Sequence, residues 1–500
     1  MDQIRDNSKL IKFLIVLIAL IFIFFLVYRF RSDFDYPIHV DEWHHITQAT
    51  YIINTEHIPS CKEYLELGYR PIAYIEVGFF LFLSQIILLT GIDPVLQYRI
   101  LPPIFTCVAA FMAFLLSYKF TKKFYVGVFT MLIFGSIKSN FNILGNLFFT
   151  PLSFGFALIY LMFFTITEGI KRRSLELILI SMMLSATLII IHPPSVIMVY
   201  FIIFVYLILR ANIIKENFTS KIVLIAFLVI FLTYLLYDLE SLDYDVLTPR
   251  VIKNHIFGRL VQLKGSYPAE AYYDLWDFYG NAQSILAIIG IFFVLKRDRR
   301  LVFALWSIIT VSIIFMFGIY GVSIISTYQK MIFYASMSLA VLSGIGLNFI
   351  LELFMKIPYK SIGSILALIF LATVFFYIFK DYYPGIPDGY LVREKDYEVA
   401  KWLKDNNYSS RTVLGTFFTS EALYSVSGNY PIANIFFKGN GTARSDMGSF
   451  FGSNCTIKKE IIDRYNISLI VSESEIECDN FSYEQIYNKN MFFIYEVKNN

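Results

Sequence analysis

The chain has 500 residues, of which 57% are hydrophobic and 18% aromatic, and its mean hydropathy is +0.60. Soluble globular proteins contain roughly 45–50% apolar residues, so the composition excludes an ordinary soluble protein and predicts a membrane protein. The net charge of +3 gives no sign of a nucleic-acid partner, and we expect none.

Long apolar segments predict helices over most of the chain. They cover residues 10–28, 72–89, 99–117, 124–138, 150–166, 175–191, 194–210, 221–237, 281–295, 301–319, 331–351 and 361–379. The first carries only Lys12 as a charge, and no small-residue cleavage site follows it, so we expect a retained span rather than a signal peptide. After Lys380 the sequence becomes mixed and charged. Two domains are therefore predicted, a membrane domain over residues 1–380 and a smaller one over residues 381–500.

Basic loops predict the orientation, because Lys and Arg near span ends stay cytoplasmic. These loops are residues 119–123, 171–173, 210–221, 296–300 and 356–360. Consecutive basic loops are separated by two apolar segments, so all five can lie inside. The N-terminus is also basic, yet three segments separate it from the first of these loops. We therefore expect the segment 72–89, which contains Glu76, to dip into the outer leaflet and return.

The predicted fold class is an α-helical multi-pass membrane protein with about 11 crossings, one dipping helix and a small C-terminal α/β domain outside the cytoplasm. In this scheme the loops 29–71 and 238–280 also lie outside, and the N-terminus is cytoplasmic.

The C-terminal region reads as a small α/β domain. Helices are predicted over Glu394–Asp405 and Ile457–Tyr465, and strands begin at Arg411, Ile467 and Met491. Most Asn-x-Ser/Thr acceptor sites lie in this region, which agrees with an extracellular location; they begin at Asn407, Asn440, Asn454, Asn466 and Asn480. Four cysteines are too few for a disulfide framework. The two C-terminal ones, Cys455 and Cys478, can pair if this region is extracellular, but we expect them to be unpaired.

The segment HVDEWHHITQAT, residues 39–50, combines two carboxylates, a tryptophan and two histidines soon after the first span. Its apolar residues recur at helical spacing, which predicts an amphipathic helix in the membrane interface with Trp43 as its anchor. Asp41 then stands at the helix N-terminus, where the dipole favours a carboxylate. Two interpretations stay open: Asp41 only caps the helix and Glu42 is solvated, or Asp41 is a general base. A metal site formed with the two histidines is less favoured, because the spacing matches no zinc-protease signature.

Several features together resemble the glycosyltransferases of the GT-C fold, which include protein O-mannosyltransferases, lipid A aminoarabinose transferases and oligosaccharyltransferases. They are the long first span, the Asp41-Glu42 pair in the first outer loop, a YRP segment before a short apolar helix, and the outer α/β tail. YRILPPIFTCVAAFMAFLLSYKF from Tyr98 and YQKMIFYASMSLAVLSGIGL from Tyr328 are similar to the family too. The resemblance implies transfer of a sugar from a polyprenyl (dolichyl-type) phosphate to an acceptor. It also implies that Asp41 is the base and Glu42 its partner.

Two departures from the oligosaccharyltransferases are visible. The second outer loop, Ser139–Pro151, contains asparagines but no carboxylate, and the tail lacks the tryptophan-rich signature of those enzymes. We therefore expect no cofactor, with a divalent metal not favoured, and a donor other than an oligosaccharide. The acceptor is a lipid, a glycan or a protein.

A polyprenyl-phosphate donor leaves as a phosphate, whose charge Arg and Lys side chains stabilise. The predicted substrate-binding residues are His44, Arg70, Glu76, Arg250, Lys253, Arg259 and Lys330. Lys330 is the most interesting, because the family often has a basic residue at the start of that helix. The alternative for each cation is that it reaches the surface or pairs with lipid headgroups. His192 lies at a span end, where a functional role is possible, but the two prolines that follow it favour a structural break.

Two other functions stay open. A flippase for a lipid-linked saccharide would tend to show repeated halves, and the sequence has no internal repeat. A non-catalytic scaffold with a glycan-binding outer domain would tolerate the loss of Asp41. The asymmetric spans and large outer domain favour the enzyme.

Overall fold

The computed structural model describes residues 2–58, 76–140, 143–210, 212, 217–236, 261–263, 275–295, 301–380, 382, 392–433, 442–479, 481–489 and 491–498. Contacts divide the chain into two compact units. The helical unit comprises Met1–Arg31 and Ile100–Gly385, and the sheet unit comprises Ser32–Arg99 and Ile386–Asn500. The contacts thus group the first long loop with the C-terminal segment, while the domain boundary at residue 380 stays a prediction.

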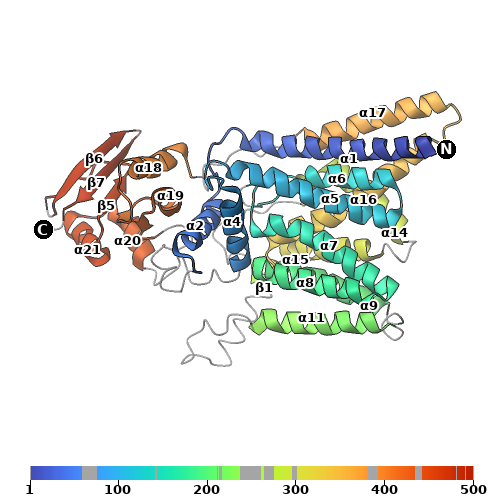
Figure 1. Ribbon diagram of the computed structural model, residues 1–500, viewed down its shortest axis with the longest axis horizontal. Coiled ribbons are helices and arrows are strands. Elements are labelled where there is room, and N and C mark those ends of the chain that lie inside the picture. The colour runs from blue at the N-terminus through green and yellow to red at the C-terminus, as the bar shows by residue number, and fades with distance from the viewer. Residues whose placement is uncertain are drawn as a thin grey trace. The chain divides into compact units, whose positions relative to one another are not determined.

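The helical unit is built from apolar helices (Figure 1). They are α1 (Asp2–Arg31), α5 (Leu101–Thr121), α6 (Phe124–Gly135), α7 (Pro151–Arg172), α8 (Leu175–Ile191), α9 (Pro193–Leu209), α11 (Phe218–Leu236), α13 (Leu275–Tyr279), α14 (Asn281–Leu295), α15 (Leu301–Tyr320), α16 (Tyr328–Phe354) and α17 (Lys360–Phe379). Two short strands, β1 (Val261–Leu263) and β2 (Val322–Ile324), pair antiparallel. The apolar segments predicted from the sequence within this unit are confirmed as helices.

Within the described residues, six helices are long and apolar enough to cross a membrane. They cover Ser8–Arg31, Tyr98–Thr121, Pro151–Arg172, Leu301–Tyr320, Tyr328–Phe354 and Lys360–Phe379. Shorter apolar helices cover Val77–Thr90, Phe124–Gly135, Leu175–Ile191, Pro193–Leu209, Phe218–Leu232 and Asn281–Leu295. The protein is therefore a multi-pass, mostly helical membrane protein, and the count of about 11 crossings stays a prediction.

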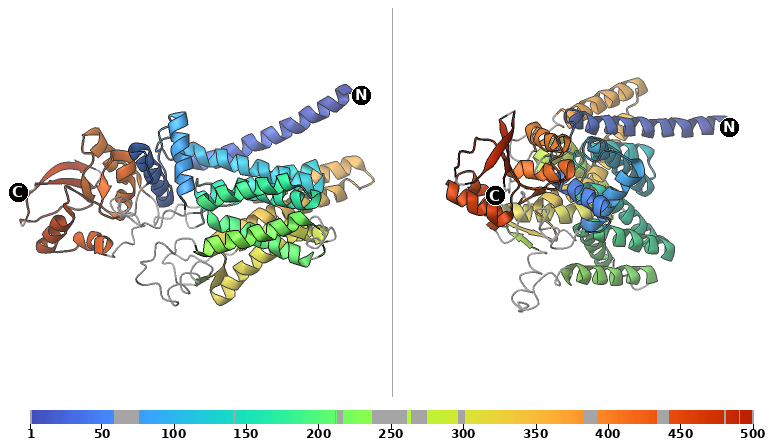
Figure 2. Two further views of the ribbon diagram at one scale, coloured as in Figure 1. Left: turned by 60° about the horizontal axis from the view of Figure 1, so that its bottom comes forward. Right: turned by 60° about the vertical axis from the view of Figure 1, so that its left-hand side comes forward.

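Close approach of helix backbones holds the core of the helical unit together. A Cβ atom at Gly290 would overlap the carbonyl oxygen of Leu342, and one at Gly346 would overlap that of Leu286. Small residues permit such contacts between membrane helices, so α14 and α16 pack backbone to backbone. Helix α16 also packs against α6 and α15 and lies among the other helices of its unit (Figures 1 and 2).

The sheet unit contains one five-stranded sheet and the helices around it (Figure 1). Its elements are α2 (Val40–Thr55), α4 (Val77–Thr90), α18 (Glu394–Asp405), β3 (Thr412–Leu414), α19 (Phe417–Ser427), β4 (Tyr430–Pro431), α20 (Thr442–Phe450), α21 (Cys455–Tyr465), β5 (Leu469–Ser472), β6 (Tyr483–Lys489) and β7 (Phe492–Val497). The strand order is β4-β3-β5-β7-β6. Strand β3 is parallel to β4 and β5, whereas β7 is antiparallel to β5 and β6.

Both faces of this sheet are covered, since all four residues of β5 are buried. Ile470 and Tyr495 belong to a core cluster with the apolar residues of α20 and α21. On the other face, Lys395 of α18 lies over the ring of Phe492 at 5.2 Å from its centroid. The predicted helix over Glu394–Asp405 is confirmed residue for residue.

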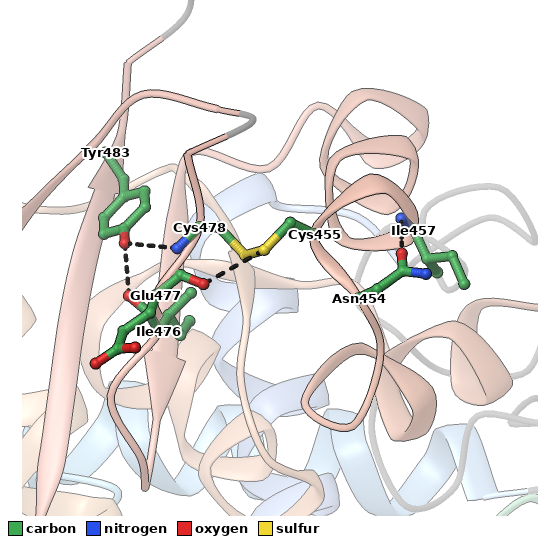
Figure 3. The surroundings of a disulfide bond; sticks show 7 residues. All are labelled: Asn454, Cys455, Ile457, Ile476, Glu477, Cys478 and Tyr483. Atoms are coloured by element: carbon green, nitrogen blue, oxygen red, sulfur yellow. Dashed lines mark hydrogen bonds between the residues drawn. A yellow bond between two sulfur atoms is a disulfide. The ribbon is translucent and has the colours of Figure 1, made fainter.

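Cys455 and Cys478 form a disulfide bond, so our expectation that they are unpaired is wrong (Figure 3). Their Cα atoms are 5.5 Å apart although 23 positions separate them in sequence. The bond joins the first residue of α21 to the segment before β6. That segment is also held by Tyr483, whose hydroxyl accepts from the backbone N–H of Cys478 at 3.2 Å and donates to the carbonyl oxygen of Ile476 at 2.5 Å.

Candidate functional site

The N-terminus of α2 is closed by a histidine and a glutamate. His39 is the N-cap, and its Nδ1 accepts the backbone N–H of Asp41 at 3.1 Å. The side chain of Glu42, which is fully buried, accepts the backbone N–H groups of Ile38 and His39 at 3.3 and 3.4 Å. This is a capping box, in which orphan N–H groups at a helix start are satisfied by side chains.

The structure differs from the first of the two interpretations, in which Asp41 caps the helix and Glu42 is solvated. Glu42 is buried rather than solvated, and Asp41 is not the cap; both expectations are wrong. The side chain of Asp41 is 34% exposed, and its Oδ2 lies 3.8 Å from Nδ1 of His39. The same Nδ1 accepts the backbone N–H of Asp41. The side chains of His39 and Glu42 accept the backbone N–H groups at the start of α2, and the carboxylate of Asp41 is not used there.

Helix α2 is packed on several sides within the sheet unit. Trp43 is fully buried, and its ring centroid lies 6.3 Å from that of Tyr397 in α18. Our prediction of Trp43 as a membrane anchor is therefore wrong. On another side, the Ser84 hydroxyl of α4 donates to the carbonyl oxygen of Ala49 at 3.1 Å. Contacts with α19 complete the packing, so the helix presents Asp41 from a fixed backbone.

The two histidines of α2 lie against the aromatic rings of α4. Their ring centroids are 5.4 Å apart, and that of His45 is 4.9 Å from the ring of Phe79. His44 lies 5.6 Å from Phe80. Burial lowers the pKa of His44 to about 3 and that of His45 well below its ordinary value. Both are therefore neutral at neutral pH. They supply no positive charge for a phosphate, and His44 as a substrate-binding residue stays a prediction.

Lys330 lies in the first turn of α16, where the sequence analysis expected a basic residue. The backbone N–H of Tyr328, at the start of the same turn, donates to Oε1 of Gln262 in β1 at 2.7 Å. Lys330 itself is partly buried. A helix N-terminus carries partial positive charge, so the ammonium group of Lys330 adds to a potential that already favours anions.

A buried polar network that sequence reasoning missed lies between α8, α9 and α16. Nδ1 of His192 is 2.7 Å from Oγ of Ser195, and that Oγ is 2.9 Å from the hydroxyl of Tyr334. These three residues are 1%, 0% and 0% exposed. The sequence signal was only a histidine before two prolines. Its partner Tyr334 is 139 positions beyond Ser195, so the pattern along the chain could not show the network.

Other predicted residues are placed less fully. Glu76 is the N-cap of α4 and partly buried, so it stands at the start of the helix rather than within it. A carboxylate is favourable at that end. Arg70, Arg250, Lys253 and Arg259 lie outside the described residues.

The second loop predicted outside has a structural role. Nδ2 of Asn146 donates to the carbonyl oxygen of Phe134 at 2.8 Å, and the Thr106 hydroxyl donates to the carbonyl oxygen of Asn146 at 2.9 Å. The loop thereby ties the start of α5 to the end of α6.

The described residues contain no preformed cluster of metal-ligating side chains. Within the described ranges, no group of three or more His, Cys, Asp or Glu side chains is placed to hold an ion. Glu42, the natural partner of Asp41 as a ligand, uses its carboxylate on two backbone N–H groups. The expectation that no metal is used stays a prediction.

The chain was compared with known families, proteins and structures. No family model matches it, and no curated protein matches it. Among solved structures, the apo oligosaccharyltransferase of Archaeoglobus fulgidus matches with a TM-score of 0.63 and 14% identity over 91% of this chain and 69% of that one. The same archaeal enzyme, AglB, in complex with an inhibitory peptide and a dolichol-phosphate matches with a TM-score of 0.62 and 12% identity over 93% and 69%. Its complex with Zn and sulfate matches with a TM-score of 0.59 and 12% identity over 92% and 67%. The GT-C resemblance is thereby confirmed: the chain has the fold of the archaeal oligosaccharyltransferase.

Proposed function

We propose that the protein is an inverting membrane glycosyltransferase, which moves a sugar from a polyprenyl phosphate to an acceptor on the outer face of the membrane. The fold supports this class, because one structure with the same fold is a complex with a dolichol-phosphate and a peptide. The disulfide agrees with an outer location for the sheet unit, since disulfides persist in oxidising compartments.

The main support for the proposal is that the two carboxylates of α2 differ in their structural roles. Glu42 satisfies the helix start, so Asp41 is not needed for capping. A partly exposed carboxylate on a rigid helix can accept a proton from an acceptor group within reach. A structural account of the pair explains Glu42 fully and leaves Asp41 only the helix dipole and its contact with His39.

In the proposed reaction, Asp41 takes the proton of the acceptor as the acceptor atom attacks the anomeric carbon. The bond from that carbon to the phosphate oxygen breaks, and its electron pair leaves with the polyprenyl phosphate. Attack opposite to the leaving group inverts the anomeric configuration. Lys330 stabilises the charge that develops on the phosphate.

The test is the pair Asp41→Asn and Glu42→Gln in the purified full-length protein. Asn keeps the shape of Asp but removes the base, so donor turnover should fall roughly 10²–10⁴-fold with the melting temperature unchanged. Glu42→Gln should lower the melting temperature and affect turnover less. A matched control is Asp35→Asn, because Asp35 is an exposed carboxylate of the same segment that is paired with Arg99 at 2.6 Å.

Near-normal turnover in a folded Asp41→Asn protein would remove the proposed mechanism. The alternatives are separated by product analysis. A flippase moves the intact donor between leaflets of a vesicle and releases no free polyprenyl phosphate, whereas a scaffold does neither.

A further inference from the structure

We propose that His192 and Lys330 form a binding site for the phosphate group of the polyprenyl carrier, with Ser195 and Tyr334 holding the imidazole in place. This inference rests on the proposed function for the identity of the carrier. It adds His192 as a phosphate-binding residue and assigns the hydrogen-bond network as its support.

The backbone first fixes where His192 lies. His192 ends α8 and is the N-cap of α9, and prolines occupy the first positions of α9. Its N–H donates to the carbonyl oxygen of Leu188 at 2.7 Å, and its carbonyl oxygen accepts the N–H of Ser195 at 3.1 Å. Because both backbone groups are bonded and proline restricts the next residue, the side chain leaves the junction in one fixed direction.

The hydrogen-bond chain then selects the tautomer of His192. Either hydroxyl group can donate in the contact between Tyr334 and Ser195; because a phenol is the stronger donor, we assign Tyr334 as the donor to Oγ of Ser195. Ser195 in turn donates to Nδ1 of His192. With Nδ1 accepting, the proton of a neutral imidazole lies on Nε2. That Nε2–H is a donor held by two buried hydroxyl groups.

This donor is left without a partner inside the described part of the chain. Nε2 of His192 is buried and has no hydrogen-bond partner there, while His192 as a whole is 1% exposed. A buried donor that stays unsatisfied costs about 1–3 kcal/mol. Several other buried side-chain atoms also lack a partner among the described residues. Nε2 of His192 differs from them because two hydroxyl groups fix the imidazole, and buried polar groups normally find partners, so we take it as a donor to a ligand.

Lys330 gives the chemical class of that ligand. Lys330 and Tyr334 are four residues apart on α16, so their side chains lie on the same face, one turn apart. Tyr334 reaches the network through Ser195, so Lys330 stands one helical turn from a residue of the network. An ammonium group, an imidazole N–H and the start of α16 together favour an anion that accepts several hydrogen bonds. A phosphate oxygen fits these donors.

Two substitutions of His192 distinguish the roles of its two ring nitrogens, Nδ1 and Nε2. Asn places an amide near the position of Nδ1, so His192→Asn can keep the bond to Ser195 but loses the Nε2 donor. Gln is longer and places an amide near Nε2, so His192→Gln restores a donor toward the ligand. Ser185→Ala is the matched control, because Ser185 of α8 bonds the hydroxyl of Tyr200 in α9 at 3.1 Å and is equally buried.

The experiment measures binding of a polyprenyl monophosphate, the matching polyprenol and inorganic phosphate to the purified full-length protein by calorimetry. His192→Asn should weaken polyprenyl monophosphate binding about tenfold, the loss expected for one hydrogen bond to a charged group. The same variant should leave polyprenol binding unchanged. His192→Gln should recover most of the affinity, and Ser185→Ala should bind as the parent does.

Three results would overturn the inference. They are unchanged monophosphate binding in His192→Asn, equal losses for the monophosphate and the polyprenol, and inorganic phosphate binding as tightly as the lipid phosphate. The last result would assign the site to a free anion. Because binding is measured without turnover, this inference and the role of Asp41 fail separately: a fully active Asp41→Asn protein removes the proposed reaction but not the phosphate site.

Discussion

The two units of the protein satisfy their polar groups in different ways. In the helical unit, buried hydroxyl groups bond one another across helices, as Ser307 does with Ser338 at 2.8 Å. In the sheet unit, charged side chains hold helix starts and join strands. Asp396, which is fully buried, accepts from Arg393 at 2.8 Å and from Thr419 at 2.6 Å.

The candidate functional groups of the two units differ in the same way. In the helical unit, Nε2 of His192 is one of several buried side-chain atoms that have no hydrogen-bond partner among the described residues. In the sheet unit, the carboxylate of Asp41 takes no part in closing the start of α2 and is 34% exposed. Under the two proposals above, the imidazole of His192 binds the phosphate of the carrier, and the carboxylate of Asp41 takes the proton of the acceptor. The stability of each unit should therefore respond to different changes.

The largest effect is expected from crowding the helical unit. Gly346→Ala would place a Cβ against the carbonyl oxygen of Leu286, and a helix backbone cannot move aside. We expect a loss of about 3 kcal/mol, seen as faster hydrogen exchange in α14 and α16 but not in the sheet unit. Gly155→Ala is the control, because its nearest neighbour is the end of the flexible Leu188 side chain at 3.3 Å. Equal effects of the two changes would contradict this account.

Loss of the disulfide should affect only the sheet unit. Replacing Cys455 and Cys478 with serine frees a loop of 23 positions, which should cost about 2–3 kcal/mol. Hydrogen exchange should accelerate in α21 and β5, and reductant should reproduce the effect in the parent protein. If reductant instead loosened the helical unit first, the two units would not be separate in stability.

The cap of α2 should show an effect of intermediate size. Glu42→Ala leaves two backbone N–H groups without their carboxylate, at a cost of about 2 kcal/mol. His39→Asn should be nearly neutral, because Asn is a good N-cap. Thermal unfolding of both variants measures the difference. A neutral Glu42→Ala would mean that the capping box does not hold the helix.

The smallest effect is a pH dependence of the sheet unit. The pKa of His44 is lowered to about 3 by burial, whereas an unfolded histidine has a pKa of about 6.5. As the pH falls below the unfolded value, the unfolded state takes up protons first and stability decreases. The slope is at most about 1.4 kcal/mol per pH unit for each such histidine. Unfolding between pH 7 and 5 should become less pH-dependent in His44→Phe, and an unchanged slope would show that His44 is charged when folded.

Much of the architecture was predictable because it depends on local composition. The apolar segments of the helical unit became helices, since a long apolar run in lipid must satisfy its backbone internally. The helix Glu394–Asp405 was also predictable, because its apolar residues recur at helical spacing and acidic residues lie in its first turn. Lys330 lies in the first turn of α16, as expected from its place before an apolar segment.

The failures concern groups whose role depends on a neighbour. The sequence shows that Asp41 and Glu42 begin a helix, but the capping residue was decided by His39 and by the turn of the chain before it. Cys455 and Cys478 pair because α21 and the segment before β6 meet on the sheet. Trp43 is of a residue type that is common at membrane interfaces, but here it is buried beside Tyr397.

The sequence by itself determined the membrane class and the apolar helices, because hydrophobicity and helical period are properties of neighbouring residues. Only the tertiary structure decided which of the two carboxylates, Asp41 or Glu42, closes the helix start. It also decided that His192, Ser195 and Tyr334 meet, since a hydrogen bond across 139 positions requires the helices to be packed first.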